Sequence, residues 1–324
     1  MKNKKVINYS PSISDIRNEI NSIMDKYIYK KEIHCDKNFI PKVSIILICL
    51  NASLTISRAL KSISGQKYKN YELIVIDGGS NDSTLSILEL NKEFIDIIIS
   101  HPDKGISDAF NRGISVASGE YIAFHNADDM WPVEHLDTCI DILQSNKTAS
   151  FVYGDLIRYD ETNGNIYQLN ADLYKKNSFL MSWAPIFNHP TFVTRYKIFE
   201  NYGLFNTEYS ICMDLDWLIR VLKKGEIGIY SNNVWVIMYH GGVSDNPFKM
   251  YKEVKKILLK YGNKYHCVYA MYILSMLKLL MKSSLLLIIN YEKLIFIKSR
   301  LFKNINTLKS EKIIEIKKII NNFS

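Results

Sequence analysis

Two adjacent aspartates, Asp128 and Asp129, are the residues whose types and spacing most directly suggest chemistry. They follow a short apolar run, residues 121–124, that we predict to be a buried strand. Adjacent carboxylates repel each other and are not expected in a core unless a cation lies between them and a ligand. A divalent metal that carries a diphosphate fits this pattern. The sequence Asn126-Ala127-Asp128-Asp129 is also good turn chemistry, so the neighbouring residues must decide.

Two further aspartates follow predicted strands. Asp77 comes after the run 71–76 and precedes Gly78 and Gly79, and Asp103 lies in the loop after the run 94–99. A carboxylate at position 77 can accept an N–H from a base edge, and the glycines let a ligand approach the backbone closely. An Asx turn that closes the strand is the alternative. The sequence contains no GxGxxG, which makes a dinucleotide site a weak reading, and no GxxxxGK[ST], which excludes a P-loop.

Asp214 and Asp216 open a predicted helix. Helix N-termini stabilise carboxylates, so simple capping explains one of the pair well. A transferase needs a base to deprotonate an acceptor hydroxyl, and the other aspartate can serve. Positions i and i+2 of a helix face different directions, so we expect only one to reach the acceptor. We predict Asp214 as the base and assign Asp216 to the helix end, where Arg220 is placed to pair with it.

Two histidines lie near predicted strands. His240 follows the run 234–238 and precedes two glycines, so it could complete a metal shell or contact a diphosphate. His189, next to Pro190, lies in a loop that enters a strand and could line an acceptor pocket. A structural role is the more common one for a lone histidine, and for His189 the two roles are equally well supported.

The elements that must position these residues alternate along the chain. Continuous apolar, β-branched runs predict strands that are buried on both faces, and short connections join them to amphipathic helices. This alternation is typical of a doubly wound, mostly parallel sheet with helices on both faces, an α/β fold. Ligands of such sheets bind beyond the carboxyl ends of the strands, so we expect Asp77, Asp103 and Asp128 to converge. The strands are predicted at 43–49, 71–76, 94–99 and 121–124, and the helices at 53–64, 82–90, 107–117 and 133–143. Ser53 is predicted to cap the first helix, and Asp82 or Ser83 the second.

After this region the pattern is less regular. We predict a strand at 151–154, a polar irregular segment at 155–176 with a hairpin turn at Asn163-Gly164, and a strand at 234–238. Residues 1–41 form an N-terminal extension in which Ile13, Ile16, Ile20, Ile23 and Tyr27 recur at helical spacing. We therefore divide the chain into 1–41, a domain at 42–245 with halves 42–132 and 133–245, and a mainly helical C-terminal region at 246–324.

The charge is concentrated in the C-terminal region. The chain of 324 residues has a formal charge of +8, yet residues 249–324 alone hold 16 Lys and Arg against 4 Asp and Glu. A basic segment suits an anionic membrane surface or nucleic acid, and the long Leu, Ile and Met runs favour lipid. The uncharged runs 265–277 and 283–291 are shorter than the ~18–20 residues that span a bilayer. We predict a helix in the membrane interface, with packing on the domain as the alternative, and no nucleic-acid partner.

Cysteine usage and the N-terminus bear on the compartment. The five cysteines are odd in number, widely spread and without a CxxC pair, which argues against a disulfide framework or a zinc site. The first residues are basic but are not followed by the apolar core of a signal peptide. We expect a cytoplasmic protein at the inner face of the membrane.

Taken together, several blocks of the sequence resemble the family 2 glycosyltransferases, in the right order and over about residues 43–245. The blocks are Val43-Ser44-Ile45-Ile46, Val75-Ile76-Asp77-Gly78-Gly79-Ser80-Asn81-Asp82-Ser83-Thr84, Pro102-Asp103-Lys104-Gly105-Ile106-Ser107-Asp108-Ala109, Asn111-Arg112-Gly113 and 119–129. The resemblance implies a GT-A fold and an inverting, metal-dependent hexosyl transfer from a nucleotide sugar, usually UDP-linked, with Mn²⁺ or Mg²⁺ as cofactor.

The resemblance also implies roles for individual residues. Asn126-Ala127-Asp128 takes the place of the family's Asp-x-Asp motif, with Asn126 as a departure that removes one charge. Met213 is a second departure, because an acid often precedes the base there. The resemblance implies base contact for Asp77, closure over the nucleotide for Asp103 and Lys104, metal binding for Asp128 and catalysis for Asp214. Together with the residue types discussed above, the predicted sites are Asp77, Gly78, Asp103, Lys104 and Asp108 for the nucleotide, Asp128, Asp129 and His240 for the metal, Asp214 for catalysis, and His189 and Asp216 for the acceptor.

The implied acceptor is a glycan hydroxyl, and the basic C-terminal region favours a lipid-linked glycan. This predicts a role in cell-surface polysaccharide or lipopolysaccharide and O-antigen biosynthesis at the cell envelope. Two alternatives belong to other classes. A catalytically silent nucleotide-sugar binder is disfavoured by Asp128, Asp129 and Asp214. A sugar-nucleotide nucleotidylyltransferase would need a glycine-rich basic loop after the first strand, where Asn51-Ala52-Ser53-Leu54 stands instead.

Overall fold

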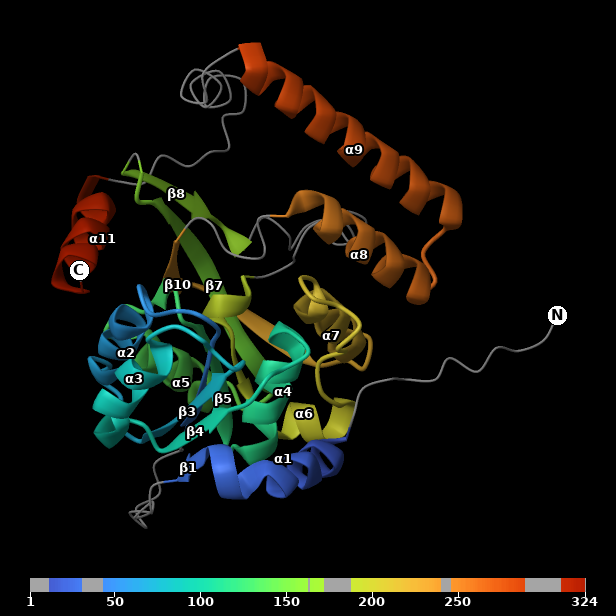
Figure 1. Cartoon of the computed structure of the whole chain (residues 1–324). Coiled ribbons are helices and arrows are strands. Elements are labelled where there is room, and N and C mark those ends of the chain that lie inside the picture. The colour runs from blue at the N-terminus through green and yellow to red at the C-terminus, as the bar shows by residue number, and fades with distance from the viewer. Residues whose placement is uncertain are drawn as a thin grey trace.

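A curled ten-stranded sheet runs through the chain, with helices on both faces (Figure 1). The computed structural model describes residues 12–30, 43–162, 164–171, 188–239, 246–288 and 310–323. Along the sheet the strands follow the order β1-β4-β3-β2-β5-β9-β7-β10-β6, and β8 pairs with β7 off this path. The α/β fold class predicted from the sequence is therefore confirmed.

Four strands of the first half are mutually parallel. Their Val-, Ile- and Leu-rich sequences are buried almost throughout, as expected for a parallel sheet covered on both faces. The register pairs Cys49 with Asp77 and Asp77 with Ser100, so the carboxyl ends of neighbouring strands meet at one edge. The strands are β2 (Val43–Cys49), β3 (Tyr71–Asp77), β4 (Ile97–Ser100) and β5 (Tyr121–Asn126).

The first-half helices lie close to their predicted positions: α2 (Ile56–Ser64), α3 (Thr84–Leu90), α4 (Ile106–Val116) and α5 (His135–Ser145). The predicted cap at Ser53 is wrong, because α2 begins three residues later and the Ser53 N–H donates instead to Asp82 (3.1 Å). The same Asp82 accepts the backbone N–H of Thr84 (2.9 Å), so it caps the start of α3 as one of the two predicted candidates.

Antiparallel pairing enters in the second half. β9 (Val193–Arg195) lies antiparallel between β5 and β7 (Ala149–Asp160), and β10 (Ile227–Tyr239) runs parallel to β7. β7 forms a hairpin with β8 (Asn165–Leu169), which confirms the predicted turn near Gly164. The irregular segment predicted at 155–176 is wrong at 155–160 and 165–169, where the end of β7 and β8 supply each other's backbones with hydrogen bonds. Residues 172–176 lie outside the described residues.

One glycine permits the close approach of β7 and β10. A Cβ added to Gly154 would lie 1.8 Å from the carbonyl oxygen of Val234, a distance that no side chain can occupy. The register shifts at this point, between Tyr230 and Trp235 of β10. β10 begins at residue 227 rather than at the predicted 234, because residues 227–230 pair with β7 ahead of the polar residues 231–233, which fall in the register shift.

Two hydrophobic cores lie on opposite faces of the sheet. Alternation along β2 sends Ile46 and Ile48 into the core with α4 and α7 (Met213–Leu222), and Ile45 and Leu47 into the core with α2 and α5. Both cores are continuous from the first half into the second. The two predicted halves therefore share their packing in the described residues.

The N-terminal segment joins the sheet. The predicted amphipathic helix is confirmed as α1 (Ile13–Tyr27), whose Ile16 and Ile20 are buried in the core beside α4. A short strand that we did not predict, β1 (Ile28–Lys30), follows and pairs antiparallel with β4. The domain limits at 41/42 and 245/246 stay a prediction.

Three helices are described in the C-terminal region: α8 (Pro247–Lys260), α9 (Tyr265–Ile288) and α11 (Ser310–Phe323). α8 packs against α7, α9 packs against α8, and α11 contacts α2 and shares a small core with β10 (Figure 1). Ile316 and Ile320 of α11 are buried in a small core with Met130 and Trp235. Across the described part of the chain, none of the helices has both the length and the apolar character that a bilayer span requires.

Candidate functional site

Three loops that carry aspartates follow strand ends at the carboxyl edge of the first four strands. Asp77 ends β3, Asp103 follows β4 and Asp128 follows β5. A Cβ added to Gly78 would lie 2.6 Å from Oδ2 of Asp103, so the Asp103 carboxylate lies directly over the Gly78 backbone. The loops after β3 and β4 are thus in contact, as the strand-end rule predicted for this edge.

The Asp77 carboxylate is buried and closes its own loop. Its Oδ2 accepts the N–H groups of Gly79 (3.2 Å) and Ser80 (3.0 Å), and the hydroxyl of Ser100 (2.7 Å). Its Oδ1 accepts the Ser80 hydroxyl (2.5 Å). This is the Asx-turn arrangement that we had kept as the alternative. Asp77 therefore shapes the loop and ties it to β4, while its predicted contact with a base stays a prediction.

The loop after β4 is fastened to the start of α4. Asp103 accepts the N–H of Gly105 (2.8 Å), and burial raises the pKa of the Asp103 carboxyl. Asp108 accepts the N–H of Lys104 (3.0 Å) and pairs with Arg112 (3.1 Å), whose guanidinium also donates to two carbonyls of the loop. The Lys104 side chain itself is exposed. The loop thus presents a cation at the rim, where an anionic ligand can meet it.

The two adjacent aspartates differ in environment. Asp129, on β6 (Asp129–Met130), is 1% exposed, and its Oδ2 accepts the side-chain N–H of Asn126 (2.7 Å). Its Oδ1 is buried and has no hydrogen-bond partner. Burial, and then the charge of Asp128, raise the pKa of Asp129 well above its ordinary value, while Arg158 of β7 opposes the shift. Asp128 is partly exposed, and His240 lies outside the described residues.

This donor set fits a cation that is shared with a diphosphate. Among the described residues, no group of three or more metal-ligating side chains comes together. Magnesium and manganese bind through one or two carboxylates when phosphate oxygens and waters complete the shell. Two adjacent carboxylates, one of them with a buried oxygen that lacks a partner, meet that requirement.

Asp214 lies in the first turn of α7 and is partly exposed. Its Oδ1 accepts the N–H of Leu215 (2.8 Å). Burial raises the pKa of Asp214 to about 6, against the opposing effect of backbone hydrogen bonds, and Glu253 adds to the rise. A carboxylate with this pKa is suited to accept a proton near neutral pH.

Asp216 is 1% exposed and faces α8. Its Oδ1 accepts hydrogen bonds from the ammonium of Lys260 (2.8 Å) and the hydroxyl of Tyr261 (3.2 Å). The predicted pairing with Arg220 is present at 3.8 Å. These contacts hold α7 against α8, and a role of Asp216 toward an acceptor stays a prediction.

Helix α4 connects the nucleotide-side loop to the Asp214 helix. The Ser107 hydroxyl donates to the carbonyl of Tyr209 (2.5 Å) and contacts Sδ of Met213 (3.1 Å). The Asn111 side chain exchanges two hydrogen bonds of 2.9 Å with the backbone of Phe205. The helix that begins beside Asp103 and Lys104 therefore also holds the segment that delivers Asp214.

His189 lies among aromatic side chains below this edge. Its ring centroid is 5.1 Å from that of Phe110 on α4 and 5.0 Å from that of Phe124 on β5. Burial lowers the pKa of His189 to about 3, so the ring is neutral at pH 7. Its Nε2 is buried without a hydrogen-bond partner. The predicted acceptor contact of His189 stays a prediction.

Sequence reasoning missed two residues near the site. Arg158 fell in the segment predicted as irregular, because it lies in the polar last residues of β7, which carry no strand pattern of their own. Glu253 accepts hydrogen bonds from residues 210–212, just before Asp214. Glu253 is the single acid among five lysines in α8, but this pattern does not indicate which residues it contacts.

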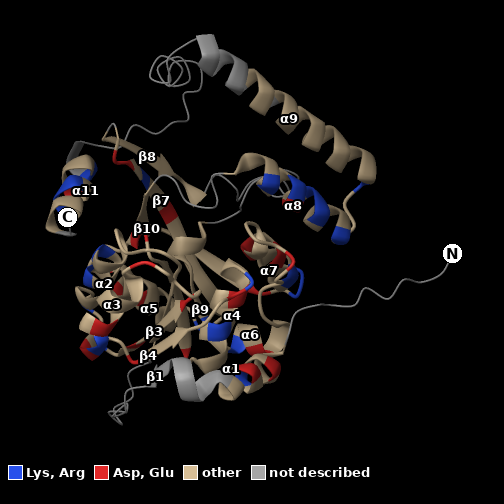
Figure 2. Cartoon of the chain, viewed as in Figure 1, with Lys and Arg blue, Asp and Glu red and all other residues tan. Residues whose placement is uncertain are grey.

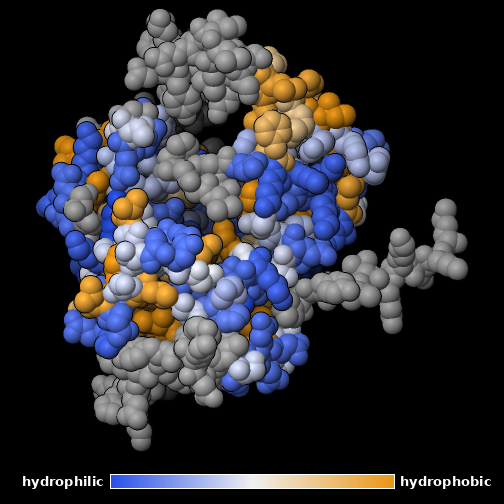
Figure 3. Space-filling model, in the orientation of Figure 1, coloured by the Kyte–Doolittle hydropathy of each residue, from blue (hydrophilic) through white to orange (hydrophobic). Residues whose placement is uncertain are grey.

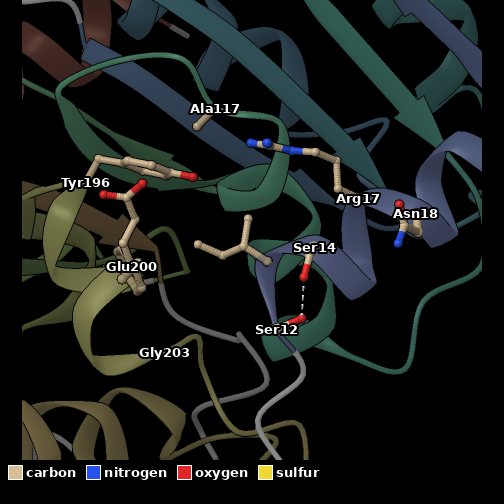
Figure 4. A pocket seen from close by; sticks show the side chains of 10 residues that line it. Ser12, Ser14, Arg17, Asn18, Ala117, Tyr196, Glu200 and Gly203 are labelled. Carbon is tan, nitrogen blue, oxygen red and sulfur yellow. Dashed lines mark hydrogen bonds between the residues drawn. The ribbon is translucent and has the colours of Figure 1, made fainter.

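A cavity of about 690 Å³ lies at the other end of the strands. It opens between α1, the residue after α4, and α6 (Lys197–Tyr202), as Figure 4 shows with Arg17, Ala117, Tyr196 and Glu200. Ala117 comes before β5 begins, whereas the aspartates follow the ends of their strands. This cavity is therefore separate from the aspartate-lined edge, to which we assign the candidate site.

Comparison with known proteins gives related sequences. The family model described as "Glycosyl transferase family 2" matches residues 44–203. A PGL/p-HBAD biosynthesis glycosyltransferase of Mycobacterium bovis (strain BCG / Pasteur 1173P2) is 30% identical over 214 residues, which cover 63% of this chain and 80% of that protein. The Escherichia coli UDP-Glc:alpha-D-GlcNAc-diphosphoundecaprenol beta-1,3-glucosyltransferase WfgD is 37% identical over 124 residues, 38% of this chain and 47% of that protein.

Solved structures share the fold. The mannosyltransferase PcManGT from Pyrobaculum calidifontis, in complex with GDP-Man and Mn²⁺, superposes with a TM-score of 0.57 at 16% identity, covering 86% of this chain and 88% of that one. S. aureus TarS 1-349 in complex with UDP-GlcNAc superposes with a TM-score of 0.54 at 15% identity, covering 71% and 70%. At these identities the likeness concerns the fold alone.

Proposed function

This chain belongs to glycosyl transferase family 2, and we propose that it transfers a hexosyl group from a UDP-linked sugar to a hydroxyl of a lipid-linked glycan, with inversion at the anomeric carbon. Glycosyltransferase activity follows from the family; one relative is named for PGL/p-HBAD biosynthesis, and another for glucosyl transfer to alpha-D-GlcNAc-diphosphoundecaprenol. One observation of this structure supports the proposal above the others. Helix α4 joins the Asp103–Lys104 loop to the segment that carries Asp214. The proposed nucleotide-binding loop and the proposed catalytic base are therefore next to each other.

The donor side consists of the loops after β3, β4 and β5. We assign the nucleoside to the loop of Asp77 and Gly78, and the diphosphate to Lys104 and the carboxylate pair at Asp128 and Asp129. Asp103 and Asp108 shape the loop that presents Lys104. A divalent cation held by Asp128 and Asp129, with His240 as a further ligand, would offset the negative charge of the leaving diphosphate.

The chemical step uses Asp214 as general base. The acceptor oxygen forms a bond to C1 of the sugar while the bond from C1 to the diphosphate oxygen breaks on the opposite face. The acceptor proton passes to the Asp214 carboxylate, and the diphosphate leaves with the bonding electron pair beside Lys104. The raised pKa of Asp214, about 6, makes it a stronger base than an ordinary aspartate and keeps it ionised at pH 7.

The C-terminal helices support a membrane-bound acceptor. Large apolar side chains of α9 are exposed, among them Leu274 (58%), Leu280 (56%) and Met281 (63%). Figure 3 shows a hydrophobic area where α9 lies in Figure 1. Lysines line the neighbouring α8 (Figure 2). An apolar face beside basic residues suits the interface of an anionic membrane, and we propose peripheral contact there. The relative WfgD is named for a diphosphoundecaprenol acceptor, which is consistent with this proposal.

A thermal-shift panel of nucleotide sugars with Mn²⁺ tests the proposed donor. A true donor binds only the folded state and raises its melting temperature, by an amount that grows with ligand concentration. We expect one UDP-sugar to stabilise the wild-type protein and to lose its effect in Asp128→Asn. Glu208→Gln, an exposed change in the same chain, is the matched control and should keep the shift. A panel in which no nucleotide sugar raises the melting temperature would contradict the proposal.

A further inference from the structure

A carboxylate from the C-terminal region holds the segment that precedes Asp214. Glu253 of α8 is 9% exposed and accepts hydrogen bonds from three consecutive residues. Its Oε1 accepts the N–H (3.0 Å) and hydroxyl (2.7 Å) of Ser210, and its Oε2 accepts the N–H groups of Ile211 (3.0 Å) and Cys212 (2.9 Å). Burial alone would raise the pKa of Glu253, but these hydrogen bonds outweigh it and lower the pKa.

The start of α7 needs such an acceptor. The first N–H groups of a helix have no partner within the helix and are usually satisfied by a side chain at the N-cap. The N-cap of α7 is Cys212, whose side chain makes no capping hydrogen bond. Of these groups, Glu253 accepts the N–H of the N-cap residue Cys212. Its other donors, Ser210 and Ile211, precede the helix, so Glu253 fixes the segment that leads into the turn of Asp214.

A second, reciprocal contact lies further along both helices. Asp216 of α7 accepts from Lys260 at the end of α8 and from the following Tyr261. Glu253 and Lys260 are seven residues apart, which is about two helical turns or roughly 10 Å along the helix axis. α8 is thus fastened to α7 at two points, and Asp214 lies in the turn that they fix.

We propose that Glu253 is a positioning residue for transfer: by holding residues 210–212 it orients the turn that carries Asp214. The proposal rests on the proposed function, in which Asp214 is the base. It assigns a role in the catalytic domain to a residue of the C-terminal helices.

The charges around Asp214 give the proposal a second, electrostatic consequence. From α8, Glu253 adds a negative charge and contributes to the raised pKa of Asp214. On α7, Asp216 is paired with Lys260 and Arg220, and the pKa of the Cys212 thiol is raised by burial, so the thiol is neutral. α4 contributes the uncharged Ser107 to this segment. Removing the Glu253 charge should therefore lower the pKa of Asp214. The fall of the rate on the acid side of the pH profile, its acid limb, should then move to lower pH.

The test compares Glu253→Gln, Glu253→Asp and the control Glu208→Gln by steady-state transfer between pH 4.5 and 8.5. Glu208 is a fitting control because it pairs with Lys256 of α8 at the surface (2.9 Å) without contacting residues 210–212. For Glu253→Gln we expect kcat to fall at least tenfold, donor KM to change less than twofold, and the acid limb to move to lower pH. Glu253→Asp keeps the charge, but its shorter side chain reaches fewer of the N–H groups of residues 210–212. We therefore expect kcat to fall while the acid limb of the pH profile stays at the same pH.

A kcat within twofold of wild type and an unmoved limb in Glu253→Gln would overturn the proposal, as would a loss confined to donor KM. A UDP-sugar thermal shift that persists in the variant would show that the nucleotide half is folded. If Glu253→Gln does not fold, Glu253→Asp decides, and a kcat within twofold of wild type there overturns the proposal. Absence of transfer by the wild-type protein would instead contradict the proposed function, so the two failures are distinguishable.

Discussion

The raised pKa of Asp214 predicts where the rate of transfer falls with pH. A base must be ionised to accept a proton, so activity is present above its pKa and is lost as pH falls through it. With a pKa of about 6, roughly one-eleventh of Asp214 is ionised at pH 5. With the ordinary value of 3.8, roughly nine-tenths would still be ionised at that pH. We therefore expect kcat at pH 5 to be about tenfold below its plateau.

The assay measures initial rates of nucleoside diphosphate release at saturating donor and acceptor, in buffers of constant ionic strength. Burial also raises the pKa values of Asp103 and Asp129 on the donor side, so donor KM is followed over the same pH range. Loss of donor binding would appear in KM, whereas protonation of Asp214 appears in kcat. A kcat that stays on its plateau down to pH 4.5 in folded protein would refute the assignment of the raised pKa to the base.

Three substitutions test the packing that supports the site. Asp216→Asn removes the charge of a buried carboxylate that accepts from the partly exposed Lys260. It should lower the free energy of unfolding by about 2–4 kcal/mol in urea titrations; a change below 0.5 kcal/mol would contradict the contact. Gly78→Ala places a Cβ 2.6 Å from Oδ2 of Asp103, and should raise donor KM on the order of tenfold with kcat little changed; an unchanged KM would show that this edge does not bind the donor. Ile316→Ala removes a buried side chain of α11 from the core that it shares with Met130 of β6. It should lower the free energy of unfolding by about 2–4 kcal/mol in thermal or urea unfolding, and a change near zero would mean that α11 does not pack against this core.

The first half of the fold could be predicted because its strands are continuous apolar runs. β2, β3 and β5 begin at their predicted residues, and β4 begins three residues later than predicted, after a short 3₁₀ turn at Lys92–Phe94. Burial on both faces leaves a strong local signal in the residue types. The second half lacks that signal. The strands β1 and β9 are held by backbone hydrogen bonds to residues distant in the sequence. The polar end of β7 is held by the hairpin with β8 and by the distant strand β10.

The candidate site was predictable to a similar degree. The convergence of Asp77 and Asp103 follows from the rule for strand ends, and the Asp216–Arg220 pair follows from helical spacing. The internal use of the Asp77 carboxylate did not follow, because a ligand contact and an Asx turn need the same residue types. Glu253 was missed for a different reason. Its partners lie more than 40 residues earlier in the chain, and no local pattern encodes that contact.

The most direct test of nucleotide-sugar transfer with Asp214 as base is a paired measurement on the wild-type protein and Asp214→Asn. Formation of glycosylated product from a UDP-sugar and a lipid-linked glycan is followed together with the thermal shift caused by the same UDP-sugar. We expect the wild-type protein to form product. Asp214→Asn should show an undiminished thermal shift, but its rate of transfer should be lower by at least a thousandfold, because loss of a general base lowers the rate by about this factor. Near-normal product formation by Asp214→Asn, or a wild-type protein that neither binds nor uses any nucleotide sugar, would contradict it.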